Sequence, residues 1–186
     1  DHHMLNVLAF NVDALRLSTY LHKDRNKPIV KGPVWDFDRS LESYDGRDNN
    51  PQTWGDTGGT IFFQRGWYNR LFDDPDFGQF WIDRWCEQRE PGGKFTDAHL
   101  FSILDTMQAE ITEAAPRNYA RWTSVPPNNG GSLAGEVQNI KDWLVIRTAW
   151  FDSQLAGEAI FSQNGGVVPS GTQVTLTPSA GGMIYY

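Results

Sequence analysis

The sequence predicts an α+β domain that is mostly α-helical. Several segments repeat apolar residues at helical spacing, one pair of short β-strand signals flanks a polar turn, and a long stretch between these parts has no periodicity. The chain of 186 residues is long enough for one well-packed domain and a small additional piece. Its 39% hydrophobic and 21% charged residues are ordinary for a soluble globular protein.

The first third of the chain predicts one helix, a hairpin and a loop. Residues 1–18 predict a helix that runs into a loop, because apolar residues mark one face, namely Met4, Leu5, Leu8, Ala9 and Val12. Strand signals at 19–22 and 29–35 flank the polar turn 23–28 and predict a hairpin. Residues 39–60 are rich in Gly, Asp, Asn and Pro, so we expect a long loop, which inside a compact domain is usually functional or mobile.

The middle of the chain predicts helices only. One covers 61–72, and a second begins at Asp74 and Pro75 and ends near Arg89, with proline at a tolerated first position. A third follows Thr96, with an apolar face of Leu100, Ile103, Leu104, Met107 and Ile111. The fourth has the clearest stripe, Leu133, Val137, Ile140, Leu144, Phe151 and Leu155, and the segment 126–131 separates it from the third.

After about Gly157 the composition changes and charge almost disappears. The segments 159–166 and 171–177 read as short strands and turns, typical of the opening of a β-sandwich module. The sequence ends at Tyr186, before such a module could close, so we expect a truncated segment whose strand edges are unpaired. We therefore divide the chain into a domain at 1–156 and the start of a β-module at 157–186.

Charge and cysteine content exclude several classes of protein. A net charge of −7 argues against nucleic-acid binding and against an anionic membrane surface, since both depend on Lys and Arg. A polyanionic ligand such as ATP would need a metal or a local basic site. No apolar run approaches the roughly 18 residues of a membrane span, so we expect no membrane insertion. Cys86 is alone, and the four histidines have no zinc-ligand spacing.

Three carboxylates are the candidates for chemistry: Asp13 after the first helix, and Asp36 and Asp38 after the hairpin. Phosphoryl transfer needs one carboxylate to orient the accepting hydroxyl and at least one more to hold Mg²⁺ on the ATP phosphates. Ser18 lies five residues after Asp13, where kinases usually have a metal-binding Asn. From spacing alone, surface solvation or helix capping is the favoured interpretation of an Asp-x-Asp pattern.

Two arginines and one acidic loop have competing interpretations. Arg16 and Arg39 each flank a candidate aspartate, and could contact a phosphate through a bidentate guanidinium. Ion pairing to the neighbouring carboxylates is the favoured interpretation. The loop 45–50 lacks the alternating ligands and the terminal Glu of an EF-hand, so a solvated turn is favoured over a calcium site.

The sequence around these carboxylates resembles that of the CotH (spore coat protein H-like) kinase family. The resembling segments are 6–13, 18–24 and 32–38, together with 67–72, Asp76 and Phe77, and the last helix from Glu136 to Leu155. The resemblance covers residues 1 to about 156, and its most specific element is Trp-Asp-Phe-Asp behind a hairpin. It implies the large-lobe portion of an atypical protein-kinase-like fold, with the small lobe missing.

The resemblance also implies a role for each candidate residue. Asp13 would be the catalytic-loop aspartate and Asp36 the metal-binding aspartate. Asp38 would support the same site, and Ser18 would offer a hydroxyl where the family pattern usually has an amide. The implied cofactors are ATP and Mg²⁺ or Mn²⁺, and the implied partner is a protein whose hydroxyl accepts the γ-phosphate.

The family's ATP-gripping lysine would lie upstream of this chain, because Lys23, Lys27 and Lys31 follow the catalytic loop on the wrong side. We therefore expect residues 1–186 alone to be inactive. The resemblance further implies a bacterial protein that is secreted or at the cell surface, with a cell-wall or extracellular partner. The tail from Phe161 to Tyr186 is similar to the start of chitobiase C-terminal-like β-sandwich repeats, which supports export.

Two other functions remain open. A pseudokinase-like surface module would use the same fold to bind a protein or a cell-wall glycan through the eight tryptophans, and Ser18 favours it. A metal-dependent phosphatase or hydrolase would also use the aspartates. The lack of a second cluster of His or Asp ligands counts against that enzyme.

Overall fold

The computed structural model describes residues 1–55, 60–155, 159–163 and 165–177. The described helices and strands, in chain order, are α1 (His2–Leu8), β1 (Leu21–His22), β2 (Val30–Lys31), α2 (Trp67–Phe72), α3 (Pro75–Arg89), α4 (Asp97–Ile111), α5 (Ala114–Arg121), α6 (Leu133–Gln154), β3 (Ile160–Phe161) and β4 (Leu176–Thr177). The chain is thus α+β and mostly helical, as predicted. Among the described residues, no helix combines the length and apolarity needed to span a membrane.

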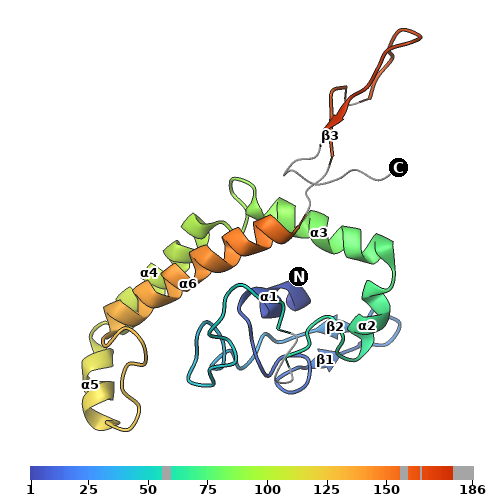
Figure 1. Cartoon of the computed structure of the whole chain (residues 1–186). Helices are drawn as coiled ribbons and strands as arrows, with labels where there is room; N and C mark the ends of the chain where they lie inside the picture. Colours follow the sequence, from blue (N-terminus) through green and yellow to red (C-terminus); the bar gives the residue numbers. More distant parts are fainter. Residues whose placement is uncertain (56–59, 156–158, 164, 178–186) are drawn as a thin grey trace.

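The helices form an open arch over the N-terminal segment. The two long helices α4 and α6 lie side by side, and α3 continues the arch toward α2 (Figure 1). Short α1 sits beneath the arch, and the hairpin of β1 and β2 lies next to α2 (Figure 1). Because α1 is enclosed in this way, the segment that follows it, residues 9–13, starts from a fixed point.

The core is formed where α1, α3 and α6 meet, and it is largely aromatic. Its most buried members are Met4, Val7, Leu8, Phe10, Val12, Phe62, Trp81, Trp85, Trp143, Leu144 and Phe151. Their rings meet edge-on or tilted, as with Phe10 and Phe62 at 5.6 Å between centroids, the geometry that aromatic pairs prefer. Much of the aromatic excess of the sequence is therefore core material.

Arg147 of α6 lies inside this core with none of its surface exposed. Its guanidinium donates to the carbonyls of Val7 (2.6 Å) and Leu8 (3.3 Å) at the end of α1, which have no partner within the helix. It also donates to the carbonyls of Pro51 (2.7 Å) and Thr53 (2.5 Å) in the long loop. Burial lowers the pKa of Arg147 to about 9, so the side chain stays charged at neutral pH. One side chain thus joins α6, α1 and the loop.

The first helix ends earlier than predicted. Residues 1–18 were expected to form one helix, but α1 stops at Leu8, and Phe10 adopts a positive φ of 51°. The apolar pattern continues past the end of α1 because Phe10 and Val12 are buried in the same core. Apolar residues that are buried in a non-helical segment can show the same spacing as the buried face of a helix. The sequence alone therefore does not distinguish a longer helix from a buried loop.

The predicted helix at 61–72 is also shorter, since only Trp67–Phe72 is helical. Gly66 precedes α2 with φ 56° and ψ −120°, a conformation that suits glycine and interrupts a helix. Phe62, in the turn before it, is buried and contacts Phe10. The hairpin is confirmed, although its strands are only two residues long, with Leu21 opposite Lys31.

The later helices agree better with the prediction. Helix α3 begins where expected, with the Asp74 side chain accepting from the Asp76 amide and Pro75 in the first turn. Helix α6 buries Val137, Leu144 and Phe151 of its predicted stripe. Helix α5 was not predicted. It is eight residues long and buries only Ala115.

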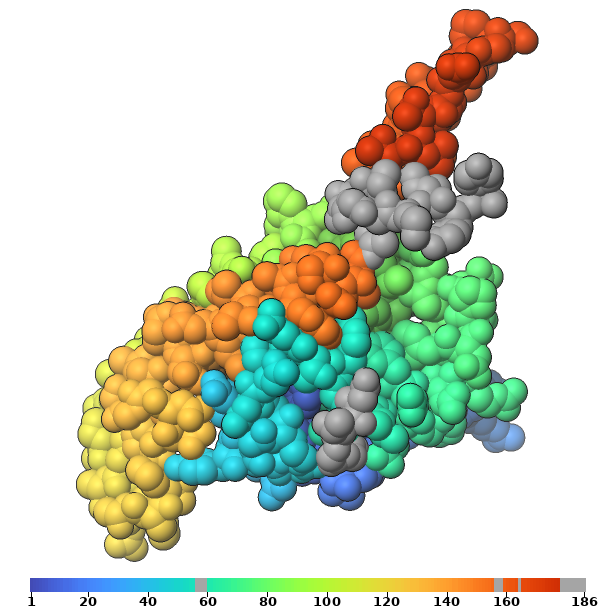
Figure 2. Space-filling view, viewed as in Figure 1, coloured from blue at the N-terminus to red at the C-terminus, as the bar shows by residue number. Residues whose placement is uncertain are grey.

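The apolar face of α4 is only half used. Leu100 and Leu104 pack against the core, but Ile103, Met107 and Ile111 are 40–57% exposed. The long loop predicted at 39–60 contains no helix or strand in its described part, 39–55 and 60. The loop packs along α6, as Figure 2 shows.

The described tail forms a separate two-stranded hairpin of β3 and β4 that extends away from the helices (Figure 1). Both strands are exposed along their length. This agrees with the expectation of short strands and a poorly packed tail. The β-sandwich assignment and the boundary near residue 156 stay predictions, and residues 156–158, 164 and 178–186 lie outside the described residues.

Replacing Arg147 by methionine is expected to lower the free energy of unfolding by about 3–5 kcal/mol, because the buried guanidinium bonds to four backbone carbonyls are lost. Arg147→Lys should also destabilise, since an ammonium cannot reach carbonyls on both sides. Urea unfolding followed by tryptophan fluorescence measures both changes. The exposed Arg117→Ala serves as the matched control and should stay within about 0.5 kcal/mol.

The stability of the fold is expected to depend on His3. Trp81 Nε1, which can only donate, bonds to His3 Nδ1 at 3.2 Å, so the proton resides on Nε2 and is donated to the Phe62 carbonyl at 3.1 Å. Burial, with the nearby Lys31 charge as a smaller contribution, lowers the pKa of His3 to about 4. The neutral form is therefore the folded form.

As the pH falls from 6.5 to 4, the His3 imidazole binds a proton in the unfolded chain but stays neutral in the folded chain. The free energy of unfolding should drop by about 3 kcal/mol over this window from this residue alone. Urea unfolding of the native chain and of His3→Gln at pH 7.5, 5.5 and 4 measures the difference. Equal pH slopes for the two proteins would refute the assignment, and exposed His22→Gln is the control.

Candidate active site

Two backbone hydrogen bonds bring the segment after α1, residues 9–13, against the segment that follows the hairpin. The Val12 amide donates to the Arg39 carbonyl at 3.1 Å, and the Leu41 amide donates to the Ala9 carbonyl at 3.0 Å. Asp13 and Asp36, far apart in sequence, therefore lie on adjoining strips of chain. This pairing also gives a physical reason for α1 to end at Leu8.

Asn11 joins the two candidate aspartates. Its side chain is 1% exposed; Nδ2 donates to the Asp36 carbonyl at 3.3 Å, and Oδ1 accepts from the Asp13 amide at 3.3 Å. A buried amide side chain with both ends engaged holds two backbone segments in a fixed relation. The sequence analysis did not single out Asn11. Its place two residues before Asp13 was the available signal.

Ser18 and Asp36 are brought together, as the predicted metal site requires. The Ser18 hydroxyl donates to Asp36 Oδ2 at 2.9 Å. Both residues adopt positive φ, 46° and 62°, which costs roughly 1–3 kcal/mol each and is uncommon for residues other than glycine. The contacts of Asn11 and of Ser18 hold this conformation at the point where the two carboxylate-bearing segments meet.

Asp13 lies within reach of three arginines. Its carboxylate is 18% exposed and is 3.2 Å from Arg16, 3.7 Å from Arg39 and 3.5 Å from Arg47. The favoured interpretation of Arg16 as an ion-pair partner of its neighbouring aspartate is therefore confirmed. Arg39 also forms ion pairs, but with Asp13 and Asp45 rather than with its sequence neighbours.

The loop at 45–50 forms turns, as predicted, with Gly46, Asn49 and Asn50 exposed, but it is also anchored to the fold. Asp48 is fully buried, and its carboxylate accepts from the Ser43 amide (2.7 Å) and hydroxyl (3.1 Å). The Trp143 indole of α6 donates to the Asp48 carbonyl at 3.1 Å. The loop is polar because its side chains bind one another, and this anchoring holds Arg47 beside Asp13.

Arg47 and Asp45 form the second charge pair of the site. The Arg47 guanidinium binds the Asp45 carboxylate in a fork, with Nη2 2.7 Å from Oδ2, and Arg39 donates to the same oxygen at 3.0 Å. The hydrogen bond from Arg47 lowers the pKa of Asp45 and raises the pKa of Arg47. Arg47 and Asp45 were missed as site residues because they lie about 30 positions from Asp13 in an aperiodic loop.

Asp38 lines a cavity of about 480 Å³ between the loop and α6. This cavity is acidic, with Glu42, Asp45 and Glu136 in its wall and Arg39 as the cation among its described lining residues. Within the described part of the chain, no three His, Cys, Asp or Glu side chains gather closely enough to hold a metal ion. Asp13, Asp36 and Asp38 therefore do not form one three-carboxylate centre.

The residues present still fit a magnesium ion that is held mainly by its substrate. Mg²⁺ commonly takes only one or two protein carboxylates and completes its shell with water and phosphate oxygens. Asp36 is exposed, and its carboxylate accepts a hydrogen bond from the Ser18 hydroxyl. A carboxylate with an adjacent hydroxyl is an all-oxygen donor set of the kind that Mg²⁺ and Mn²⁺ prefer.

Replacing Asn11 by alanine is expected to lower the free energy of unfolding by about 1–3 kcal/mol, because the part-buried Asp36 carbonyl and Asp13 amide lose the bonds that this buried side chain makes. Hydrogen exchange at the Asp13 amide should accelerate with it. Urea unfolding and exchange mass spectrometry measure the two effects. The exposed Asn118→Ala of α5 is the control; an unchanged Asp13 exchange rate in Asn11→Ala would show that Asn11 does not hold this loop.

Comparison with known proteins agrees with this geometry. A family description, the CotH kinase protein, matches residues 1–151, which include α1, the hairpin, Asp13, Asp36 and all of α2 to α5. The match ends before the tail. No curated protein and no solved structure gives a match. Since the family description covers more than half of the chain, with Asp13 and the Trp-Asp-Phe-Asp segment inside it, the chain belongs to the CotH kinase family.

Proposed function

We propose that this chain carries the catalytic-loop and metal-binding residues of an atypical protein kinase, which transfers the γ-phosphoryl group of ATP to a hydroxyl of a protein substrate. One observation carries the proposal: Asn11 binds the backbone of both Asp13 and Asp36 and so places two candidate aspartates side by side. Family membership supports a kinase.

In this proposal Asp13 orients the accepting hydroxyl and takes its proton as the bond to phosphorus forms. The Asp13 carboxylate is only partly exposed and is held by Arg16 at 3.2 Å. Its position is fixed before substrate arrives, which lowers the entropic part of the barrier. Arg16 and Arg39 each present N–H groups beside Asp13, where they can contact a phosphate oxygen as well as the carboxylate.

Asp36, with the Ser18 hydroxyl beside it, is the proposed ligand for the divalent cation. When bound there, Mg²⁺ or Mn²⁺ would neutralise charge on the ATP phosphates. Ser18 fixes the orientation of the Asp36 carboxylate through their 2.9 Å hydrogen bond. Asp38 lines the acidic cavity behind this point, so we propose for it a role in shaping the segment rather than in a shared carboxylate pair.

A second function is a pseudokinase-like surface module that binds a protein or a glycan. Two observations favour it. Ser18 stands where kinases usually have an amide ligand, and the exposed tryptophans Trp35, Trp67 and Trp122 each show more than half of their surface. A secreted or cell-surface location in a bacterium is part of both proposals, as is a cell-wall or extracellular partner.

Phosphate transfer from labelled ATP, to the chain itself and to added acceptor proteins, is the test. It should be run with Mg²⁺ and with Mn²⁺, on residues 1–186 and on any longer native chain that contains them. Asp13→Asn and Asp36→Asn should each lower transfer by roughly 10²-fold or more, since each removes a charge that acts on the reacting groups. Residues 1–186 alone are expected to show no transfer.

Asp76→Asn is the matched control, because Asp76 is exposed in the first turn of α3. It should leave transfer unchanged. Transfer that survives in Asp13→Asn would contradict the role of Asp13. No transfer under either metal from a folded longer chain would favour the binding-module function, and Ser18→Asn would then test whether the amide restores activity.

A further inference from the structure

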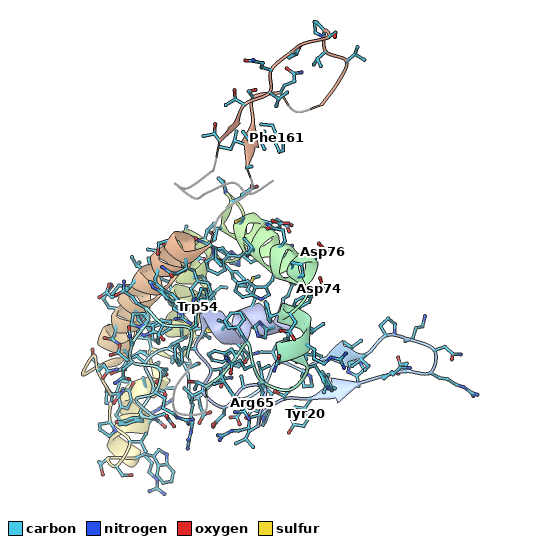
Figure 3. All side chains as sticks on the ribbon, turned by 45° about the vertical axis from the view of Figure 1, so that its right-hand side comes forward. Tyr20, Trp54, Arg65, Asp74, Asp76 and Phe161 are labelled. Atoms are coloured by element: carbon cyan, nitrogen blue, oxygen red, sulfur yellow. The ribbon has the colours of Figure 1, made fainter. Side chains whose placement is uncertain are left out.

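A basic pocket lies directly beside Asp13. Arg16, which holds the Asp13 carboxylate, also lines a cavity of about 290 Å³. The cavity opens between the catalytic-loop segment, the hairpin strands and the segment that leads into α2. Its described lining residues are Leu15, Arg16, Thr19, Leu21, Lys31, Arg65, Gly66, Trp67 and Tyr68. Figure 3 shows Arg65 and Tyr20 near the base of the hairpin, where this cavity lies.

The charge of this pocket is opposite to that of the chain. Three of its nine described lining residues are the cations Arg16, Lys31 and Arg65, and none of the nine is acidic. The whole chain has a net charge of −7, and the larger cavity at Asp38 is lined by carboxylates. A local basic site in an acidic protein attracts anions to that site and repels them elsewhere.

Lys31 is the group that most needs an anion. Its ammonium lies 4.4 Å from the centroid of the Tyr68 ring and 6.0 Å from that of Trp67. No described carboxylate forms an ion pair with it within 4 Å. Burial lowers the pKa of Lys31, so the charge is partly removed from water without a compensating partner of opposite sign. An entering anion would be bound more strongly here than at a fully hydrated lysine.

The rest of the wall is apolar and aromatic. Leu15, Leu21 and Trp67 border the cations, so the pocket accepts a charged group on a short carbon stem. Its volume is at the lower limit of the roughly 300–1,000 Å³ typical of small-molecule sites. A side chain fits this space better than a whole nucleotide does.

We propose that this pocket binds an acidic side chain, Glu or Asp, of the protein substrate. That side chain would lie next to the substrate hydroxyl that Asp13 orients. The role of the pocket in substrate selection rests on the proposed kinase function, but the binding test below does not. Arg16 connects the two sites, because its guanidinium reaches Asp13 and its side chain forms part of the pocket wall. Acceptor hydroxyls flanked by acidic residues would thus be preferred.

Fluorescence anisotropy of labelled octapeptides tests the pocket without ATP or metal. Alternating Glu-Ser, Gln-Ser and Lys-Ser peptides are titrated with the chain. Glu-Ser should bind roughly tenfold or more tighter than Gln-Ser, since a charge-assisted hydrogen bond contributes about 1.5–3 kcal/mol. Lys31→Met keeps the stem on Tyr68 and removes the charge, and it should weaken Glu-Ser binding at least about fivefold.

Lys31→Arg should retain binding, and Lys23→Met, a change at an exposed lysine outside the pocket, should have no effect. Circular dichroism confirms the fold of each variant. Equal binding of Glu-Ser and Gln-Ser, or unchanged binding by Lys31→Met, would overturn the proposal. Displacement of Glu-Ser by ADP, with an ADP affinity that falls in Lys31→Met, would assign the pocket to nucleotide instead. Peptide binding by residues 1–186, together with no phosphate transfer from a folded longer native chain under either metal, would leave this pocket standing and reject the kinase function.

Discussion

The buried guanidinium of Arg147 is the contact on which the rest of the structure depends. It reaches the end of α1 and two carbonyls of the long loop from a single position in α6. The rings of Phe10 and Phe151 lie with centroids 5.0 and 4.6 Å from it, so the charge is surrounded by aromatic faces as well as carbonyls. A buried charge of this kind is tolerated only when its N–H groups form hydrogen bonds. The hydrogen bonds of this one guanidinium hold α6, α1 and the long loop together.

Because α1 and the loop are fixed by the same side chain, the segments that follow them are fixed as well. Residues 9–13 follow directly from the end of α1. Arg47 lies in the loop that Asp48 and Trp143 anchor to α6. Their meeting point is the carboxylate of Asp13. The core therefore transmits its rigidity to the site through two short stretches of backbone, and Asn11 adds the third connection, to Asp36.

Electrostatics divides the surface near Asp13 into two regions. On one side is the acidic cavity with Asp38, Glu42 and Glu136 in its wall, and on the other is the basic pocket with Lys31 and Arg65. Arg16 and Arg39 belong to opposite regions and both contact Asp13. In water these charges would be screened within about 10 Å, but in partly enclosed cavities they retain enough strength to select the sign of an incoming group.

The sequence by itself determined the helix-rich fold class, the long helices α3 and α6, the hairpin and the family, since each depends on periodicity, capping residues or a short local motif. It also singled out Asp13, Asp36 and Ser18. The tertiary structure alone decided that α1 ends at Leu8, that the loop at 45–50 is anchored, and that Arg47, Asp45 and Asn11 surround Asp13. These features arise from contacts between residues far apart in sequence. The local sequence pattern is the same whether the buried Phe10 lies in a helix or in a loop. The partner of a polar side chain is likewise decided only when the chain folds.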